Sequence, residues 1–215
     1  MWQRSRLQWM LVPLAGTGLA LATVSVMAFF ADAAPVGSNT FTTANWCGGP
    51  GSSTVTATAD TWVDQAAPTA VNGTATTLSV QSRNSAARRS LVTFTLPTLP
   101  AGCSVTTANL RLYNQTPTSG RTIDVYRAAA AWVETTVNWN TQPATTGTAV
   151  GAVTTGTAGY QQWTVTAHVQ AQYTTNRGFV IRDRTETGGS TLTQTYRSRE
   201  HATTTTRPEL IVNWA

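Results

Sequence analysis

Lysine is absent from this 215-residue chain, and charged residues of either sign are few. All 14 basic residues are arginine, and charged residues make up only 11% of the chain. A helical bundle needs Leu, Glu, Lys and Ala on long periodic faces, so this composition argues against one. Thr, Ser, Gly, Asn and Gln dominate the polar remainder, and the β-branched side chain of Thr suits a pleated surface. The composition therefore favours an all-β protein.

The net charge of +5 does not indicate a nucleic-acid partner, because the chain has no basic arm. Two of the arginines, Arg4 and Arg6, lie near the N-terminus, and the others are scattered along the sequence. A nucleic-acid-binding protein usually gathers its basic residues into a patch or stripe. We therefore expect no nucleic-acid partner. The charge instead indicates contact with an acidic polysaccharide or a cell wall, or serves solubility alone.

Cysteine and histidine are also scarce, with two residues of each. Cys47 and Cys103 lie 56 positions apart, and an isolated pair in an exported protein predicts one disulfide. Two buried free thiols are the alternative. His168 and His201 are not at metal-ligand spacing from either cysteine or from each other. We expect neither a metal site nor a cofactor.

The N-terminal segment has the features of an export signal. Arg4 and Arg6 precede an apolar run over residues 11–30, and an A-x-A cleavage motif follows at residues 31–33. We predict a signal peptide over residues 1–33, although cleavage after Ala28 is a competing possibility. The run is also long enough to span a bilayer, so an uncleaved anchor is the alternative. The protein is thus expected to be secreted, with membrane contact only if the segment is retained.

The rest of the chain divides into a polar linker, residues 34–54, and one domain, residues 55–215. Short alternating runs separated by turn residues are typical of an all-β sandwich or barrel. In the clearest run, Ala108, Leu110 and Leu112 share one side and Arg111 and Tyr113 the other. The predicted strands cover residues 56–63, 77–81, 89–96, 107–113, 122–127, 162–165, 178–182, 192–197 and 209–214, and one short helix covers residues 167–173.

Several motifs occur in a specific order along this domain. They are ADTWVD at residues 59–64, RRSLVTF at 88–94, ANLRLY at 108–113, W-V-E at 132–134, VNWNTQP at 137–143, YRSRE at 196–200 and PELIV at 208–212. Together they resemble the DNRLRE-type domain, which overlaps a carbohydrate-binding module family known for binding alginate. The resemblance covers residues 55–214. It implies a jelly-roll-type β-sandwich with a non-catalytic role, in which basic residues on one face contact uronic-acid carboxylates.

The candidate ligand-binding residues are arginines and aromatics of this domain. A guanidinium group holds a carboxylate through two parallel hydrogen bonds, and an aromatic ring can cover the apolar face of a pyranose. Arg88 and Arg89 point to opposite sides of their strand, and we expect Arg89 on the more solvent-like side. The candidates are Arg89, Arg197, Arg199, Trp62, Tyr113 and Tyr126. The alternative is that the arginines form structural bridges to Asp60, Asp64 or Glu200.

No catalytic constellation is evident in the sequence. It contains no G-x-S-x-G, H-E-x-x-H or P-loop motif, and the spacing of the acidic residues does not pair them across a cleft. His201 beside Arg199 and Glu200 is the single suggestive cluster. We therefore predict a secreted, non-enzymatic module for an acidic, uronate-containing polysaccharide. The alternative is a cell-surface or extracellular-matrix structural protein that has no glycan ligand of its own.

Overall fold

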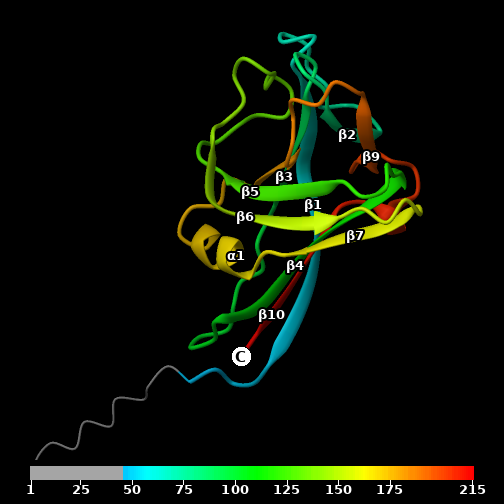
Figure 1. Ribbon diagram of the computed structural model, residues 1–215. Coiled ribbons are helices and arrows are strands. Elements are labelled where there is room, and N and C mark those ends of the chain that lie inside the picture. The colour runs from blue at the N-terminus through cyan, green and yellow to red at the C-terminus, as the bar shows by residue number, and fades with distance from the viewer. Residues whose placement is uncertain (1–45) are drawn as a thin grey trace, which may run out of the picture. The chain divides into compact units, whose positions relative to one another are not determined.

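The computed structural model describes residues 46–215 (Figure 1). The predicted signal peptide or anchor, residues 1–33, and residues 34–45 of the predicted linker lie outside the described residues. Within the described part, no helix is long and apolar enough to cross a membrane.

The domain consists of ten strands, one short helix and a single 3-10 turn, which confirms the all-β expectation. The elements are β1 (Gly51–Asp64), β2 (Thr77–Ser82), β3 (Arg88–Phe94), β4 (Val105–Thr116), β5 (Thr122–Ala128), β6 (Thr145–Val153), β7 (Gly159–Thr164), α1 (Thr166–Gln172), β8 (Phe179–Asp183), β9 (Leu192–Arg197), η1 (Thr204–Thr206) and β10 (Glu209–Trp214). Strand β6 was not foreseen, and β1 begins at Gly51, within the stretch predicted as linker.

The strands close into a barrel, to which further strands are added. Neighbours pair in the order β1-β10-β4-β9-β2-β3, and β3 pairs back with β1 to complete the ring. The first half of β1 pairs with β10 and the second half with β3, with a register shift between Ala57 and Ala59. Strands β8, β5 and β6 extend the sheet from β3, and β7 pairs with β4. The jelly-roll arrangement itself stays an expectation of the resemblance.

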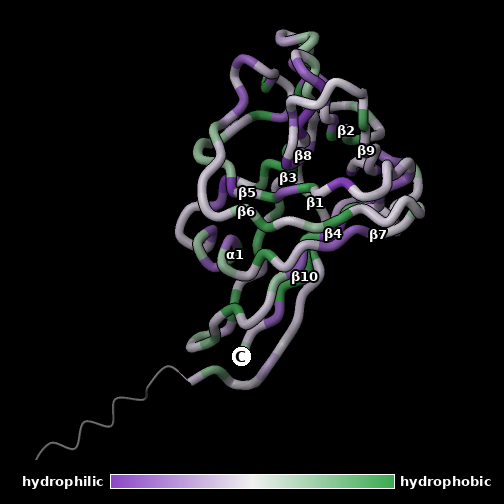
Figure 2. The backbone as a smooth tube through the Cα atoms, viewed as in Figure 1, coloured by the Kyte–Doolittle hydropathy of each residue, from purple (hydrophilic) through white to green (hydrophobic). Residues whose placement is uncertain are grey.

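Alternation along the strands determines which side chains fill the barrel. Figure 2 shows hydrophobic stretches of backbone along the strands. On β4, Ala108, Leu110 and Leu112 are fully buried as predicted, and they pack in one core with residues such as Trp163 and Tyr196. Burying each large apolar side chain contributes roughly 1.5–3 kcal/mol. The outer residues of β4 are left for the surface, which is where the candidate site lies.

A second, smaller core lies on the outer side of β3 and differs from the expectation for Arg89. Leu91, which shares a side with Arg89, is fully buried and packs with Val63 and Val180. The connection between β5 and β6 covers this cluster with Val137 and Trp132. Arg89 therefore lies beside a covered surface and not on an open sheet face.

The two cysteines form the predicted disulfide. Cys47 and Cys103 are bonded, with their Cα atoms 4.3 Å apart, and the bond joins the segment before β1 to the segment before β4. The sequence separation is 56 residues. A cross-link that closes a loop of this length stabilises mainly by restricting the unfolded chain.

Replacing both cysteines, Cys47→Ser with Cys103→Ser, should lower the free energy of unfolding by about 4 kcal/mol, because the loop-closure entropy is restored to the unfolded state. Urea unfolding followed by tryptophan fluorescence measures the shift, with reduced wild-type protein as the matched control. Equal midpoints for the oxidised protein and the double variant would contradict this account.

Candidate functional site

Two tyrosines and two arginines form a continuous group on the outer side of β4, β7 and β9. Tyr113 and Tyr160 are register partners, with ring centroids 5.5 Å apart at an interplanar angle of 84°. The Arg111 guanidinium lies 4.1 Å from the centre of the Tyr160 ring, and the Arg197 guanidinium lies 4.5 Å from that of Tyr113. We call Arg111, Tyr113, Tyr160 and Arg197 the arginine–tyrosine face.

Polar side chains continue this face along β4. Arg111 lies across from Gln162 on one side and from Glu209, with which it forms an ion pair, on the other. One step further, the Thr164 hydroxyl donates to Asn109 Oδ1 at 3.1 Å. Each of these residues occupies an outward position because its strand alternates against the buried core. The result is an outward sheet surface rich in hydrogen-bonding groups.

Arg197 differs from Arg111 in having no carboxylate partner among the described residues. Its Nη1 donates to the Thr206 hydroxyl at 2.7 Å, while its Nε is buried and makes no hydrogen bond to any described residue. Glu209, in contrast, neutralises Arg111. Arg197 is therefore a pre-positioned cation on this face without a carboxylate partner. Because its Nε is buried, a carboxylate would bind its terminal nitrogens.

The neighbouring Tyr160 is held as a neutral hydrogen-bond donor. Its hydroxyl donates to the carbonyl of Thr205 at 2.7 Å. Partial burial raises the pKa of the Tyr160 phenol above its ordinary value of 10.0, and the charge of Glu209 adds to the rise. The phenol is protonated at neutral pH and so keeps the proton that it donates to Thr205, while its π-face contacts Arg111.

The remaining aromatic candidates lie apart from the arginine–tyrosine face. Tyr126 on β5 is covered by Arg182 at 4.7 Å, and Arg89 lies 4.7 Å over Trp139. Glu186 links the two groups, because it accepts two hydrogen bonds from Arg89, both at 2.6 Å, and lies 3.9 Å from Arg182. Arg89 and Tyr126 therefore belong to a second arginine–aromatic group, in which the arginine is already paired.

Trp62 belongs to a third location, near the C-terminal end of β1. Arg88 lies 4.9 Å over the Trp62 ring and is paired with Asp64 at 2.9 Å. One of the ring faces is therefore covered by a guanidinium group. The structure brings only Arg197 and Tyr113, of the six candidates, into the arginine–tyrosine face.

Two residues of the face, Arg111 and Tyr160, were not among the candidates. Arg111 shares the outward side of its strand with Tyr113, so the alternation in residues 107–113 carried a signal for it. Tyr160 precedes the predicted strand 162–165, whereas β7 begins at Gly159 and therefore includes it.

Comparison with known families decides the class of protein. The model of carbohydrate-binding module family 96 matches residues 51–214. The chain belongs to this family. The carbohydrate-binding resemblance is thereby confirmed at family level. A search of curated proteins finds no match.

In this family 96 module, three motifs distant in sequence meet around Arg199. Its guanidinium donates to both carboxylate oxygens of Glu134, at 2.8 and 2.7 Å, and lies 2.9 Å from Glu200. Its backbone N–H donates to Asp60 Oδ2 at 2.8 Å. Arg199 therefore makes the kind of structural bridge that the alternative reading predicted.

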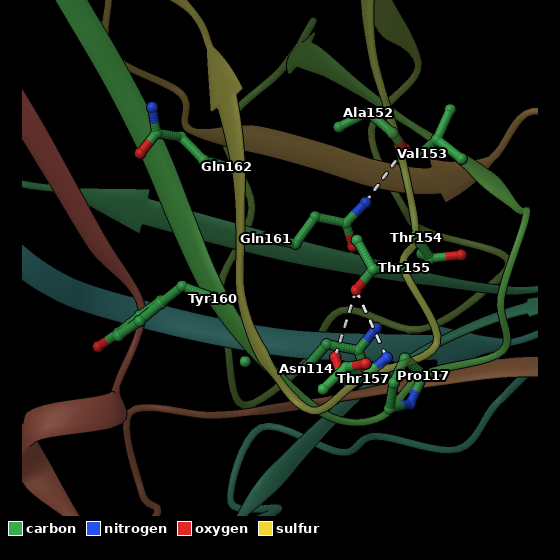
Figure 3. A pocket seen from close by; sticks show the side chains of 11 residues that line it. Asn114, Pro117, Ala152, Val153, Thr154, Thr155, Thr157, Tyr160, Gln161 and Gln162 are labelled. Atoms are coloured by element: carbon green, nitrogen blue, oxygen red, sulfur yellow. Dashed lines mark hydrogen bonds between the residues drawn. The ribbon is translucent and has the colours of Figure 1, made fainter.

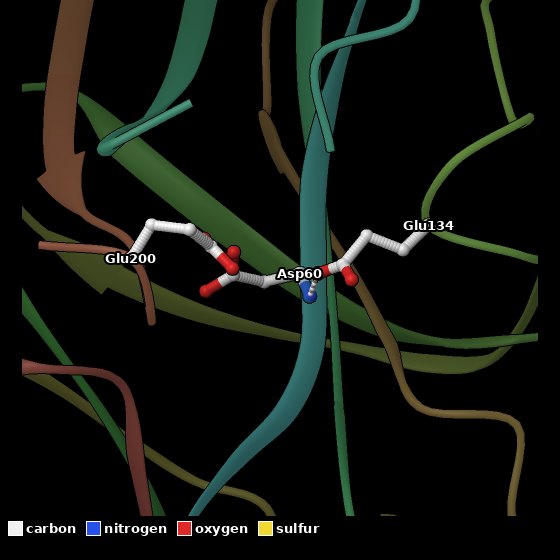
Figure 4. A group of neighbouring side chains, drawn as sticks. All are labelled: Asp60, Glu134 and Glu200. Atoms are coloured by element: carbon white, nitrogen blue, oxygen red, sulfur yellow. Dashed lines mark hydrogen bonds between the residues drawn. The ribbon is translucent and has the colours of Figure 1, made fainter. Parts of the chain in front are cut away.

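Asp60, Glu134 and Glu200 place their carboxylate oxygens within 4.8 Å of one another (Figure 4). Such a group could hold a cation by proximity alone, but Arg199 already contributes a positive charge to Glu134 and Glu200. Burial, reinforced by the negative charges of Glu200 and Glu134, raises the pKa of Asp60 from 3.8 to about 8. Asp60 is therefore protonated at neutral pH.

One shared proton accounts for two buried oxygens in this cluster. Asp60 Oδ1 and Glu200 Oε2 are buried and have no other hydrogen-bond partner among the described residues. A protonated Asp60 donates to Glu200, which satisfies both atoms. The arrangement joins β1 to the segment after β9, so its main effect is on stability.

Stability should fall as the pH rises through this proton's range. The native protein holds the proton between the unfolded pKa of 3.8 and the folded pKa of about 8, while the unfolded chain has released it. The proton's contribution to the free energy of unfolding is fully present below pH 3.8. It falls as the pH rises towards 8, by up to about 1.4 kcal/mol per pH unit. We expect Asp60→Asn, which keeps a donor towards Glu200, to flatten this slope. Urea melts from about pH 5 to pH 9 test it; identical slopes would contradict it.

Arg199→Ala should destabilise the protein by about 2 kcal/mol, because the half-buried Glu134 carboxylate loses its charge-assisted hydrogen bonds. Arg83 is exposed and forms no ion pair among the described residues, so Arg83→Ala is the matched control and should leave stability unchanged. Thermal unfolding measures both. A variant at position 199 that unfolds like wild type yet loses polysaccharide binding would assign Arg199 to the ligand instead.

Proposed function

We propose that this family 96 module binds an acidic, uronate-containing polysaccharide outside the cell without cleaving it, and that the arginine–tyrosine face is its binding surface. The observation that carries the proposal is Arg197, which is stacked on Tyr113 and has no carboxylate partner among the described residues. A uronate carboxylate is the group that such a guanidinium recognises best.

The shape of the surface supports a polymeric ligand. The face runs across neighbouring strands and continues along β4 through Arg111, Asn109 and their cross-strand partners. A sheet surface of this kind suits an extended chain, whose sugar rings lie on the tyrosines while hydroxyl groups meet the amide and hydroxyl groups. Because the tyrosine and arginine side chains hold one another in place, little conformational entropy is lost on binding.

The charge of the face supports an acidic ligand of modest affinity. Glu209 neutralises Arg111, so Arg197 supplies the net positive charge. A single shallow site of this kind should bind in the micromolar to millimolar range, about −8 to −4 kcal/mol. Because the ion pair between Arg197 and the uronate carboxylate would form at the surface, added salt should weaken binding.

The arrangement of acidic groups supports a non-catalytic role. A glycosidase needs one carboxylic acid and one free carboxylate across a bound sugar. In the described domain, carboxylates are held in ion pairs with arginine at Asp64, Asp124, Glu134, Asp183, Glu186, Glu200 and Glu209. Asp60 is protonated but is almost fully buried, so it does not meet a glycan.

Affinity electrophoresis in gels that contain alginate or pectin tests the proposal. Arg197→Ala should weaken retardation about tenfold or more, because a charge-assisted hydrogen bond contributes roughly 1.5–3 kcal/mol. Tyr113→Ala should weaken it about tenfold through lost stacking. Arg83→Ala removes an equal charge elsewhere and should have little effect.

The controls separate this proposal from a structural role. Retardation in the acidic gels should be relieved by salt, whereas neutral xylan and β-glucan gels should retard the protein less. If wild-type protein migrates freely in all gels, the polysaccharide proposal is wrong and the extracellular-matrix alternative gains support. If both face variants bind as wild type does, the ligand lies elsewhere on the module.

A further inference from the structure

A cavity of about 160 Å³ opens beside the arginine–tyrosine face, between the ends of β6 and β7 (Figure 3). Thr154, Thr155 and Thr157, from the connection between these strands, line it. Asn114 and Gln161 contribute amide groups. Tyr160 borders both the cavity and the arginine–tyrosine face. The Tyr160 ring and the Gln161 side chain point to opposite sides of β7, so the cavity lies across this strand from the face, and a glycan would have to pass the end of β7 at Gly159 to occupy both.

Gly159 lines the cavity and leaves open space there, because it has no side chain. Gly159 pairs with Asn114 across the β4–β7 ladder and shares its side of the strand with Gln161, which lines the cavity. A Cβ atom placed on Gly159 meets no heavy atom within 4 Å, and its backbone is not left-handed. Glycine weakens a strand, and in strands it often marks a place where a ligand approaches closely.

The cavity lining offers many hydrogen bonds but no charge. Hydroxyl groups come from threonines, and amide groups from Asn and Gln; the lining consists of Asn114, Pro117, Ala152, Val153, Thr154, Thr155, Thr157, Gly159, Tyr160, Gln161 and Gln162. A charged group would lose its hydration here without meeting a counter-ion, which is costly. A neutral molecule rich in hydroxyl groups suits this lining.

The amide groups of the cavity are held in one orientation. Gln161 donates from Nε2 to the carbonyl of Ala152 at 3.0 Å and accepts from the Tyr196 hydroxyl at 2.6 Å. Gln194 is oriented by Thr118, whose N–H it accepts and whose carbonyl it donates to, both at 3.0 Å. Such pre-organisation reduces the entropy lost when a ligand binds.

This network leaves one buried acceptor without a donor. Because Gln194 turns Oε1 towards Asn114, the Asn114 side chain must present Nδ2, at 2.9 Å. Asn114 Oδ1 is consequently buried without a hydrogen bond from any described residue. Buried polar atoms usually have a partner, so a donor such as a sugar hydroxyl is called for at this end of the cavity.

We propose that the cavity between β6 and β7 is a subsite for one neutral sugar residue, either a branch or a chain end of the bound glycan. This inference deepens the proposed function and rests on it for the chain that carries the sugar to the cavity. It adds a specificity that the arginine–tyrosine face lacks, because the cavity selects hydroxyl groups and disfavours a carboxylate.

Titration of ¹⁵N-labelled protein with glucose, galactose, mannose and xylose tests the subsite. At least one of these sugars should shift the side-chain amide signals of Asn114 and Gln161 and the backbone signals of residues 154–159, with roughly millimolar affinity. Glucuronate should bind more weakly. Gly159→Leu should fill the cavity and reduce binding about tenfold or more, while the protein stays folded.

Gly189→Leu is the matched control, because a Cβ at Gly189 also meets no heavy atom within 4 Å and this loop does not line the cavity. It should bind the sugar as wild type does. The subsite is refuted if none of the four sugars shifts these signals, or if Gly159→Leu binds equally well. A different result would show that the proposed function is wrong and the subsite right. In that case Arg197→Ala leaves the retardation in alginate gels unchanged, while the neutral sugar still shifts the NMR signals.

Discussion

The closure of the barrel by β1 is the constraint on which the other features depend. An open sheet leaves a row of unpaired backbone groups at each edge, and a closed ring of strands removes them. Strand β1 achieves the closure by pairing with β10 over its first half and with β3 over its second. It therefore ties the wall that carries the arginine–tyrosine face to the wall that carries the Arg89 group. The disulfide at Cys47 lies just before this strand, and the shared proton of Asp60 lies within it, so both reinforce the same closure.

Closure also determines which side chains are free for binding. Once β4 is enclosed between β10 and β7, its even-numbered residues from 108 to 114 fill the core, and the odd-numbered residues between them face outward. The outward residues then meet those of three other strands, which is how Arg197 reaches Tyr113 and Glu209 reaches Arg111. On the opposite wall, the β5–β6 connection covers the outer side of β3 with apolar residues. The two walls are thus unequal: the wall built on β4 presents outward polar side chains, whereas the outer side of β3 is covered.

Much of the fold was predictable because strand alternation is a local property. The burial of Ala108, Leu110 and Leu112, the outward direction of Tyr113, and most strand positions followed from it. Strand β6 was not predicted, because its residues, Thr145–Val153, are small and show no regular alternation of apolar and polar side chains. The site was less predictable, because it depends on contacts between distant strands. Nothing in the sequence indicated that Arg89 would pair with Glu186, 97 positions away, or that Tyr160 would lie across from Tyr113. Choosing between free and paired arginines requires the register of the closed barrel.

The absence of lysine acquires a physical meaning in this arrangement. Five arginines of the described domain lie over aromatic rings, and four of these also form ion pairs with a carboxylate. A planar guanidinium can stack on a ring and donate in its own plane at the same time, whereas an ammonium group is a compact, strongly hydrated charge without that geometry. Arg197 is the member of this set that stacks but is not paired, so its in-plane donors are oriented before any ligand arrives. In the other four contacts, the stacked guanidinium also pairs with a carboxylate of the protein. A uronate carboxylate would pair with Arg197 in the same way as Glu209 pairs with Arg111.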